Sequence, residues 1–206
     1  YQQAVPVFAD LGRNTFNLDP ADVERKITEK TKAIIAVHLA GNPSRMEELK
    51  AIADKHNLVL IEDCAQAWGA KYRGKPIGTI GHIACFSLQH SKQITCGDGG
   101  VVASSDERFG PLLQRYGDKG TDRIHSNGMY ERLATNYRMT ELQAGFAAAQ
   151  LERLENIVNT RTKLGGILGN TIRAAPGLDA HEIDGQDRCT YWFYMFRFRP
   201  EAMKCD

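Results

Sequence analysis

Two residues of this sequence have the side-chain chemistry and the setting that covalent catalysis requires. Lys92 lies in the polar stretch "SLQHSKQITCGDGG" (87–100), and Asp63 ends the apolar run "LVLIED" (58–63). A lysine amine can attack a carbonyl once desolvation or a nearby positive charge helps remove its proton. A buried carboxylate usually meets a cation, because burial without a partner is costly. On position alone, a solvated charge at Lys92 and a helix N-cap at Asp63 remain open alternatives.

Further polar residues accompany these two. Gln66 follows Asp63 by one short turn, Ser87 precedes Lys92, and Asn136 lies in "NYRM". A hydroxyl and backbone amides can hold a phosphate without a charged side chain. The patterns G-x-G-x-x-G and G-x-x-x-x-G-K-[ST] are absent, which disfavours nucleotide binding of those kinds. A lysine and an aspartate at neighbouring strand ends instead fit pyridoxal 5'-phosphate (PLP): the amine forms an imine with its aldehyde, and the carboxylate keeps its ring nitrogen protonated.

Composition excludes several classes of function. The chain has 206 residues, a formal net charge of +1, 42% hydrophobic and 25% charged residues, which is typical of a soluble globular protein. The near-neutral charge argues against a nucleic-acid or anionic-membrane surface, and no apolar run is long enough for a membrane span. The cysteines form no C-x-x-C or Cys/His metal pattern. We therefore expect a cytoplasmic protein with no metal site and with reduced thiols at Cys64, Cys85, Cys96, Cys189 and Cys205.

Strand-like and helix-like segments alternate in the first part of the chain. Apolar runs at 5–9, 32–40 and 58–63 predict strands. Asp19 and Pro20 predict the start of one intervening helix, and Ser44 with Glu47 has the spacing of a capping box at the start of the other. The order β-α-β-α-β predicts a parallel sheet covered by helices.

The pattern changes around Lys92. The strands predicted at 83–88 and 100–105 are joined by a segment without a helical pattern, so we expect the second to be antiparallel to the first. Lys92 then lies at the carboxyl end of the first strand, at the same sheet edge as Asp63, where open α/β sheets bind ligands. A loop at 117–135 precedes one long helix that we expect to run from about Thr140 to Gly165, and "TYWFYMFRFRP" (190–200) predicts a strand. We place a domain boundary near residue 155.

The chain resembles the sugar and cyclitol aminotransferases of the DegT/DnrJ/EryC1/StrS family. Three long segments carry the resemblance in the family's order and spacing: "AVHLAGNPSRMEELKAIADKHNLVLIEDCAQAWGA", "GTIGHIACFSLQHSKQITCGDGGVV" and "NYRMTELQAGFAAAQLERL". The likeness covers essentially the whole chain. It implies the type I PLP-dependent aminotransferase fold, α/β with a mostly parallel sheet and one antiparallel strand. Residues 1–155 would then be part of the PLP-binding large domain, and 156–206 the start of a smaller C-terminal α+β domain.

The resemblance also implies a role for each candidate residue. Lys92 matches the Schiff-base lysine and Asp63 the partner of the pyridine nitrogen. Gln66 matches the residue beside the cofactor ring and its phenolic oxygen, and Ser87 matches a phosphate ligand. Asn136 matches an asparagine that reaches the cofactor phosphate of the neighbouring subunit, which implies a homodimer with shared active sites.

The function that the resemblance implies is transfer of an amino group from glutamate or glutamine to a keto sugar, usually nucleotide-linked, or to a keto cyclitol. His38 is expected to be structural. Two alternatives remain open: a PLP-dependent sugar dehydratase, in which a histidine replaces the lysine, and an inactive regulatory relative, which would be expected to lose Lys92 or Asp63. The loop 117–135, with Lys119, Arg123, His125 and Tyr130, either faces the acceptor or is a solvated charged loop.

Family members extend further at both ends, with a Gly-Thr turn that holds the phosphate ahead of this region and a longer C-terminal domain. We therefore expect the isolated chain to have an incomplete phosphate cradle, low stability and exposed apolar sheet surface.

Overall fold

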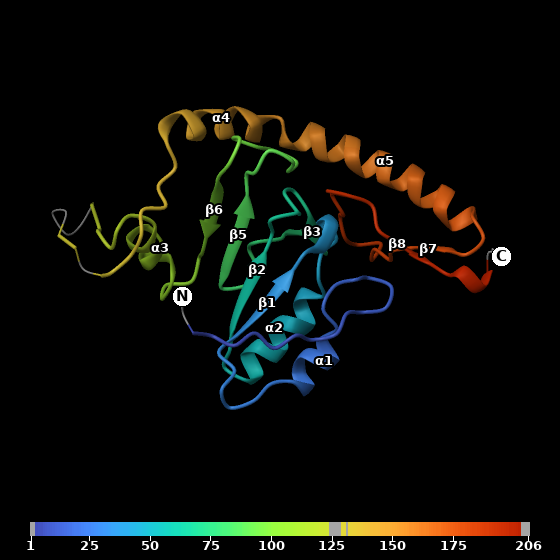
Figure 1. Ribbon diagram of the computed structural model, residues 1–206, viewed down its shortest axis with the longest axis horizontal. Coiled ribbons are helices and arrows are strands. Elements are labelled where there is room, and N and C mark those ends of the chain that lie inside the picture. The colour runs from blue at the N-terminus through green and yellow to red at the C-terminus, as the bar shows by residue number, and fades with distance from the viewer. Residues whose placement is uncertain (1–2, 124–128, 131, 203–206) are drawn as a thin grey trace.

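A four-stranded mixed sheet forms the centre of the computed structural model, which describes residues 3–123, 129–130 and 132–202. The strand order is β1 (Ala33–Val37), β2 (Val59–Asp63), β5 (Ile83–Ser87) and β6 (Gly100–Ala103). The first three strands are parallel and β6 runs antiparallel to β5, so the arrows of β5 and β6 point in opposite directions in Figure 1. The predicted α/β class and the single antiparallel strand are confirmed.

Two helices form in the regions where the sequence predicts them; the second packs on the sheet and the first packs against the second. α1 (Pro20–Arg25) begins at Asp19, whose carboxylate accepts a hydrogen bond from the Ala21 backbone N–H at 3.1 Å. α2 (Met46–Lys55) packs against β1 and β2 through an apolar stripe. The largest fully buried side chains between these layers are those of Met46, Leu49 and Leu60. Burial of this stripe is what fixes α2 on the sheet.

Two local predictions in this region are wrong. Residues 5–9 form no strand: Val5 and Phe8 are exposed, and the segment has no strand neighbour. Ser44 does not cap α2, because its hydroxyl donates to the Val37 carbonyl oxygen at 2.7 Å and the helix begins one residue later, after Arg45. A buried serine that satisfies the end of β1 is therefore unavailable as a helix cap.

The long helix predicted after Thr140 is two helices. α4 (Glu141–Glu152) begins with a capping box between Thr140 and Gln143, and α5 (Leu154–Ala174) follows after Arg153. α5 continues through Gly165 instead of ending there. A Cβ at this position would lie 2.5 Å from the Tyr191 ring. The glycine makes room for a packed aromatic ring, a reason that periodicity does not reveal.

The remaining elements are short and lie around this frame. α3 (Gly110–Gly117) follows β6, and β3 (Lys71–Tyr72) pairs with β4 (Lys75–Pro76). The strand predicted within 190–200 is limited to β8 (Phe196–Phe198), which pairs with β7 (Leu178–Ala180). Two 3₁₀ turns occur at Leu39–Gly41 and Pro200–Ala202. The domain boundary near residue 155 stays a prediction.

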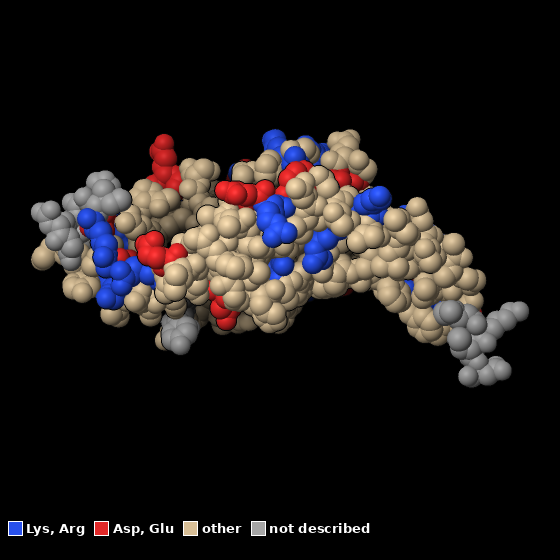
Figure 2. Space-filling view, turned by 90° about the horizontal axis from the view of Figure 1, so that it is seen from above, with Lys and Arg blue, Asp and Glu red and all other residues tan. Residues whose placement is uncertain are grey.

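The outer surface carries apolar side chains from the sheet and from α4. Ile35 on β1 is 56% exposed, and Val102 on β6 is 52% exposed, which agrees with the expected exposed sheet surface. Seen from above, the molecule shows long uncharged stretches with scattered charges between them (Figure 2). No helix within the described residues has the length and apolar character that crossing a membrane requires.

Candidate functional site

The carboxyl ends of the three parallel strands meet at one edge of the sheet. Val37, Asp63 and Cys85 are register partners across β1, β2 and β5. The connections that follow these strands carry Gln66 and Lys92, and they lie on the side of the sheet where α4 and α5 run (Figure 1). The sequence-predicted residues Lys92, Asp63, Gln66 and Ser87 therefore come from strand ends and connections on one edge of the sheet.

Lys92 lies in the connection between β5 and β6 and is partly buried. Its backbone N–H donates to the Gln89 carbonyl oxygen at 3.0 Å, which fixes a turn at this point. Its Nζ lies 3.8 Å from the centre of the Trp192 ring. No described residue forms an ion pair or a hydrogen bond with this Nζ. The amine is thus sheltered but has no anionic partner in the described part of the chain.

Asp63 is the last residue of β2 and is partly buried. Its Oδ1 accepts a hydrogen bond from the Ala65 backbone N–H at 3.0 Å, while Oδ2 accepts none from the residues that the structure describes. The segment after Asp63 consists of turns, so the helix N-cap alternative is wrong. One carboxylate oxygen fixes the turn and the other remains available to a ligand.

Gln66 and Ser87 are held by contacts with the neighbouring connections. The Gln66 Oε1 accepts from the Ala40 backbone N–H at 2.7 Å, which leaves its Nε2 donors without a described partner. The Ser87 Oγ accepts from the Gln89 backbone N–H at 3.3 Å, and the Ser87 carbonyl oxygen accepts from the Trp68 indole at 2.7 Å. These contacts fix both residues at the sheet edge.

Asn136 is exposed and lies outside this group. Its backbone forms an isolated antiparallel β-bridge with Asp118, and its side-chain Oδ1 accepts a hydrogen bond from the Arg138 backbone N–H at 3.2 Å. None of its described hydrogen bonds involves Lys92, Asp63, Gln66 or Ser87. Within one chain, the structure does not bring Asn136 to the other candidates.

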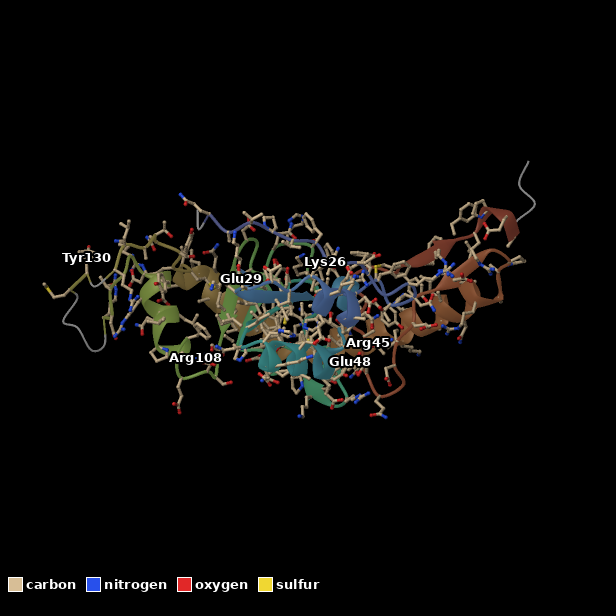
Figure 3. The ribbon with its side chains drawn as sticks, turned by 90° about the horizontal axis from the view of Figure 1, so that it is seen from below. Lys26, Glu29, Arg45, Glu48, Arg108 and Tyr130 are labelled. Atoms are coloured by element: carbon tan, nitrogen blue, oxygen red, sulfur yellow. The ribbon has the colours of Figure 1, made fainter. Side chains whose placement is uncertain are left out.

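The loop 117–135 is described only in part, and His125 lies outside the described residues. The Arg123 Nε donates to the Asp118 carboxylate at 2.5 Å. Tyr130 is 72% exposed and lies at the end of the molecule beyond α3 (Figure 3). Lys119 has a positive φ of 57°. The acceptor-facing loop stays a prediction.

The buried side chains of His38 and Glu62 form a hydrogen-bonded pair that orders the surrounding backbone. The His38 Nδ1 accepts from the Ser44 backbone N–H at 3.0 Å, so its Nε2 carries the proton and donates to Glu62 at 3.1 Å. Burial raises the pKa of Glu62, but the hydrogen bonds from His38, Gly81 and Gly78 outweigh it and leave the pKa below its ordinary value. This arrangement agrees with the predicted structural role of His38.

Cys64 completes a group of three potential metal ligands with His38 and Glu62, whose ligand atoms lie within 4.8 Å of one another. Both nitrogens of His38 and both carboxylate oxygens of Glu62 are already hydrogen-bonded. Burial raises the pKa of the Cys64 thiol, which opposes formation of the thiolate that binds metals. We interpret this group as structural.

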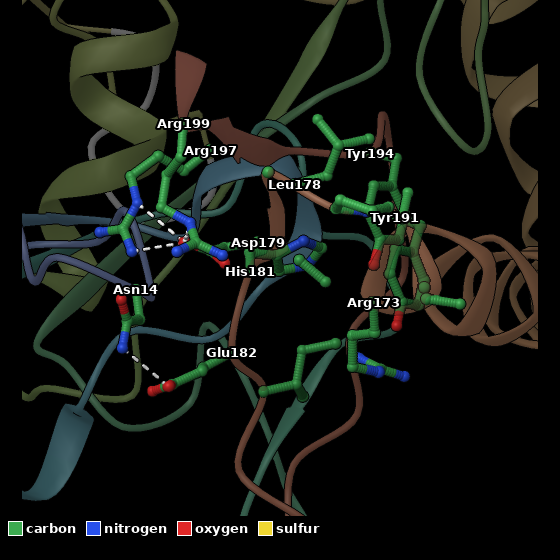
Figure 4. Close-up of a pocket in the computed structure, with 17 residues that line it drawn as sticks. Asn14, Arg173, Leu178, Asp179, His181, Glu182, Tyr191, Tyr194, Arg197 and Arg199 are labelled. Atoms are coloured by element: carbon green, nitrogen blue, oxygen red, sulfur yellow. Dashed lines mark hydrogen bonds and ion pairs between the residues drawn. The ribbon is translucent and has the colours of Figure 1, made fainter. Parts of the chain in front are cut away.

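A separate cavity of about 920 Å³ lies between the end of α5 and the β7–β8 pair (Figure 4). Asp179 extends toward Arg197 and Arg199 and pairs with both, at 2.6 and 3.0 Å, and Asn14 donates to Glu182 at 2.7 Å. None of the residues predicted to bind the cofactor lines this cavity.

The groups available at the sheet edge fit a pyridoxal cofactor. They are the Lys92 amine, the Asp63 Oδ2 and the Gln66 amide donors, which offer a nucleophile, an anion and neutral donors. In addition, the buried Gln93 Oε1 has no hydrogen-bond partner among the residues that the structure describes. Buried polar atoms are usually partnered, so this orphan oxygen next to Lys92 is consistent with a ligand or water at this edge.

Three residues that order the site were not singled out from the sequence. Glu62 and Gln93 enter the sequence analysis only as members of the segments 58–63 and 87–100. Trp192 was assigned to a strand. The alternation in "LVLIED" could have identified Glu62 as an acid on a buried face, whereas the contacts of Gln93 and Trp192 are long-range and leave no local signal.

Comparison with known proteins identifies the family. The family model described as the DegT/DnrJ/EryC1/StrS aminotransferase family matches residues 1–206. The chain is 36% identical over 192 residues to GDP-perosamine synthase of Escherichia coli O157:H7, covering 93% of this chain and 52% of that protein. It is also 36% identical to L-glutamine:2-deoxy-scyllo-inosose aminotransferase of Streptomyces paromomycinus, covering 97% of this chain and 49% of that protein.

Comparison with solved structures leads to the same family. The crystal structure of 3-amino-5-hydroxybenzoic acid synthase matches with a TM-score of 0.88 and 30% identity, covering 95% of this chain and 52% of that chain. The chain thus spans about half the length of these relatives. It belongs to the DegT/DnrJ/EryC1/StrS aminotransferase family.

Proposed function

We propose that this chain contributes the cofactor-binding part of a PLP-dependent aminotransferase, with Lys92 as the residue that holds the cofactor covalently. The observation that carries the proposal is the pair of available groups at one sheet edge. The Lys92 amine has no described ion pair, and Asp63 presents one carboxylate oxygen without a described donor. Members of the same family with related sequences are named as aminotransferases, which supports this reaction class.

When bound, PLP supplies an electron-accepting ring that stabilises negative charge at the carbon next to the transferred nitrogen. Lys92 would hold the cofactor through its amine, and as a free, neutral amine it would take the proton from the donor's α-carbon and return it at the cofactor's C4' carbon, as general base and then acid. Asp63 holds a proton at the ring nitrogen through a charge-assisted hydrogen bond. Gln66 would offer its amide donors to the cofactor ring, and Ser87 would contribute its hydroxyl to phosphate binding.

The proposed donor is glutamate or glutamine, and the proposed acceptor is a keto sugar or a keto cyclitol. The names of two relatives support this range: one is a GDP-perosamine synthase and the other an L-glutamine:2-deoxy-scyllo-inosose aminotransferase. Assays of the intact protein with both donors, against nucleotide-linked keto sugars and free keto cyclitols, would identify the pair. Absence of amino transfer to every acceptor of both classes would contradict the substrate range.

Lys92→Ala tests the covalent role directly. Borohydride treatment of the PLP-loaded protein should add the mass of the reduced cofactor to the peptide that contains Lys92, and the alanine variant should lose both this adduct and turnover. Lys50→Ala is the matched control, since Lys50 is ion-paired with Asp54 on the surface of α2. An adduct on another lysine, or full turnover by Lys92→Ala, would contradict the proposal.

We further propose a homodimer in which Asn136 serves the active site of the neighbouring subunit. Its exposed position on the single chain supports this arrangement. So does the exposed apolar surface of α4 and β6, which comprises Val101, Val102, Leu142, Phe146 and Leu151. Exposed apolar surface of this kind marks interaction sites, and two-fold dimers are the commonest oligomers.

Mixed dimers test this sharing. A dimer of one Lys92→Ala subunit and one Asn136→Ala subunit has one site with both defects and one intact site if Asn136 acts across the interface. Random mixing of the two inactive variants should then restore about a quarter of the parental activity, because half of the dimers are mixed. No restoration means that Asn136 acts within its own subunit or that the chain is not dimeric.

The dehydratase alternative receives less support, because a lysine occupies position 92. Formation of a deoxygenated sugar in place of an amino sugar would favour that alternative. An inactive regulatory relative would show neither product, and the presence of both Lys92 and Asp63 argues against it.

A further inference from the structure

Trp192 provides the described contact of the Lys92 amine. The Nζ lies 3.8 Å from the centre of the indole ring, well within the distance at which an aromatic face attracts a cation. Tryptophan has the strongest such attraction among the aromatic side chains. The ring therefore favours the position of Nζ seen here when the amine carries a charge.

The Trp192 side chain is fixed in this position from both sides. Its indole N–H donates to the Ser91 carbonyl oxygen at 2.8 Å, and its backbone N–H donates to the Ala40 carbonyl oxygen at 2.8 Å. The Arg161 guanidinium donates to the Tyr191 and Trp192 carbonyl oxygens at 2.9 and 3.3 Å. The ring is thus attached to the residue that directly precedes Lys92.

The residue that directly follows Lys92 is attached to the same segment. The buried Gln93 side chain donates from Nε2 to the Thr190 Oγ1 at 3.1 Å and to the Gln66 carbonyl oxygen at 2.7 Å. The Thr190 backbone N–H in turn donates to the Gly41 carbonyl oxygen at 3.0 Å. Residues 190–192 therefore hold the chain on both sides of Lys92 and place an aromatic face at its amine.

We propose that Trp192 is a positioning residue that receives the Lys92 amine after the amino donor has displaced it from the cofactor. In this exchange the carbon–nitrogen double bond to Lys92 is replaced by one to the donor nitrogen. The three protons of the donor ammonium are transferred to Lys92, which leaves as an ammonium group. The ring stabilises this cation close to the reaction centre until the ammonium releases one proton to solvent, after which the neutral amine can act as the general base. The inference rests on the proposed covalent role of Lys92.

Displacement by methylamine measures this effect without requiring turnover. The PLP-loaded intact protein is titrated with methylamine at constant pH and treated with borohydride, and mass spectrometry gives the fraction of protein with the cofactor still attached to Lys92. Trp192→Leu removes the aromatic face, so displacement should require about 2- to 30-fold more methylamine, the range that a cation–π contact supports. An unchanged methylamine requirement would overturn the inference.

Fluorinated tryptophans at position 192 keep the test decisive if Trp192→Leu does not fold. Fluorine withdraws charge from the ring face while the shape and the indole N–H are kept. The methylamine requirement should rise stepwise with the number of fluorine atoms, and the absence of this trend would overturn the inference. A parent protein without any cofactor adduct on Lys92 would overturn the proposed function as well, so the two failures are distinguishable.

Discussion

Glu62→Gln should destabilise the protein strongly although Glu62 does not contact the proposed cofactor groups. The Glu62 side chain is fully buried. Its Oε1 accepts from the Ile80 and Gly81 backbone N–H groups at 2.8 and 2.6 Å, and its Oε2 accepts from Gly78 at 2.7 Å and from His38 at 3.1 Å. All four partners donate, so the ionised carboxylate matches them completely.

A glutamine has one oxygen and one NH₂ group, so two of these four donors would face another donor. His38 cannot relieve the conflict by moving its proton, because its Nδ1 would then face the Ser44 backbone N–H. Removing one member of a buried, hydrogen-bonded charged pair costs about 3–5 kcal/mol. We expect a decrease of this size in the free energy of unfolding, measured by urea denaturation of the intact protein at neutral pH.

The pH dependence gives this prediction a second readout. The pKa of Glu62 in the folded protein lies below its ordinary value of 4.5, so the charged form stabilises the fold fully above the unfolded pKa and loses this effect as the pH falls through the folded pKa. The difference between the parent and Glu62→Gln should therefore shrink in acid. Glu48→Gln, at an exposed ion pair with Arg45 (Figure 3), is the control and should change stability little. Equal stability of the parent and Glu62→Gln at neutral pH would refute this reasoning.

Three further changes have defined outcomes. Asp63→Asn should slow turnover by about 10- to 150-fold, the rate equivalent of a charge-assisted hydrogen bond, whereas Asp54→Asn on the surface should not; equal rates would exclude Asp63 as the ring's partner. Gly78→Ala should cost about 2–4 kcal/mol of unfolding free energy, since φ is +83° and the new Cβ would lie 2.4 Å from the Phe86 ring; Gly74→Ala, with φ +81° and open space, should cost less. Burial raises the pKa of Cys189 to about 12 and also raises that of Cys64, so iodoacetamide at pH 8 should label neither in the native protein and both in urea; native labelling would contradict their burial.

The sheet and its polarity could be predicted because the relevant signals are local. Continuous apolar runs gave β1, β2 and β5, and the short connection around Lys92 predicted an antiparallel β6. The start of α1 was also predictable, because Asp19 and Pro20 act on the backbone next to them. These features depend on residues that are close together in the chain.

The errors concern residues whose roles depend on distant partners. Ser44 has the spacing of a helix cap, but its hydroxyl is used by the Val37 carbonyl oxygen. Gly165 has the composition of a helix end, but it lies within α5 where the Tyr191 ring packs. Trp192 was expected only as part of a strand, and the residues of its contact with Lys92 are separated by about half of the chain. Such contacts are set by packing that a single sequence does not reveal.

A crystal structure of the intact protein loaded with PLP would test the proposed arrangement most directly. We predict a covalent bond between the Lys92 Nζ and the cofactor, with the free carboxylate oxygen of Asp63 within hydrogen-bonding distance of the ring nitrogen. Density for the cofactor at another lysine, or a ring nitrogen that faces away from Asp63, would contradict this assignment.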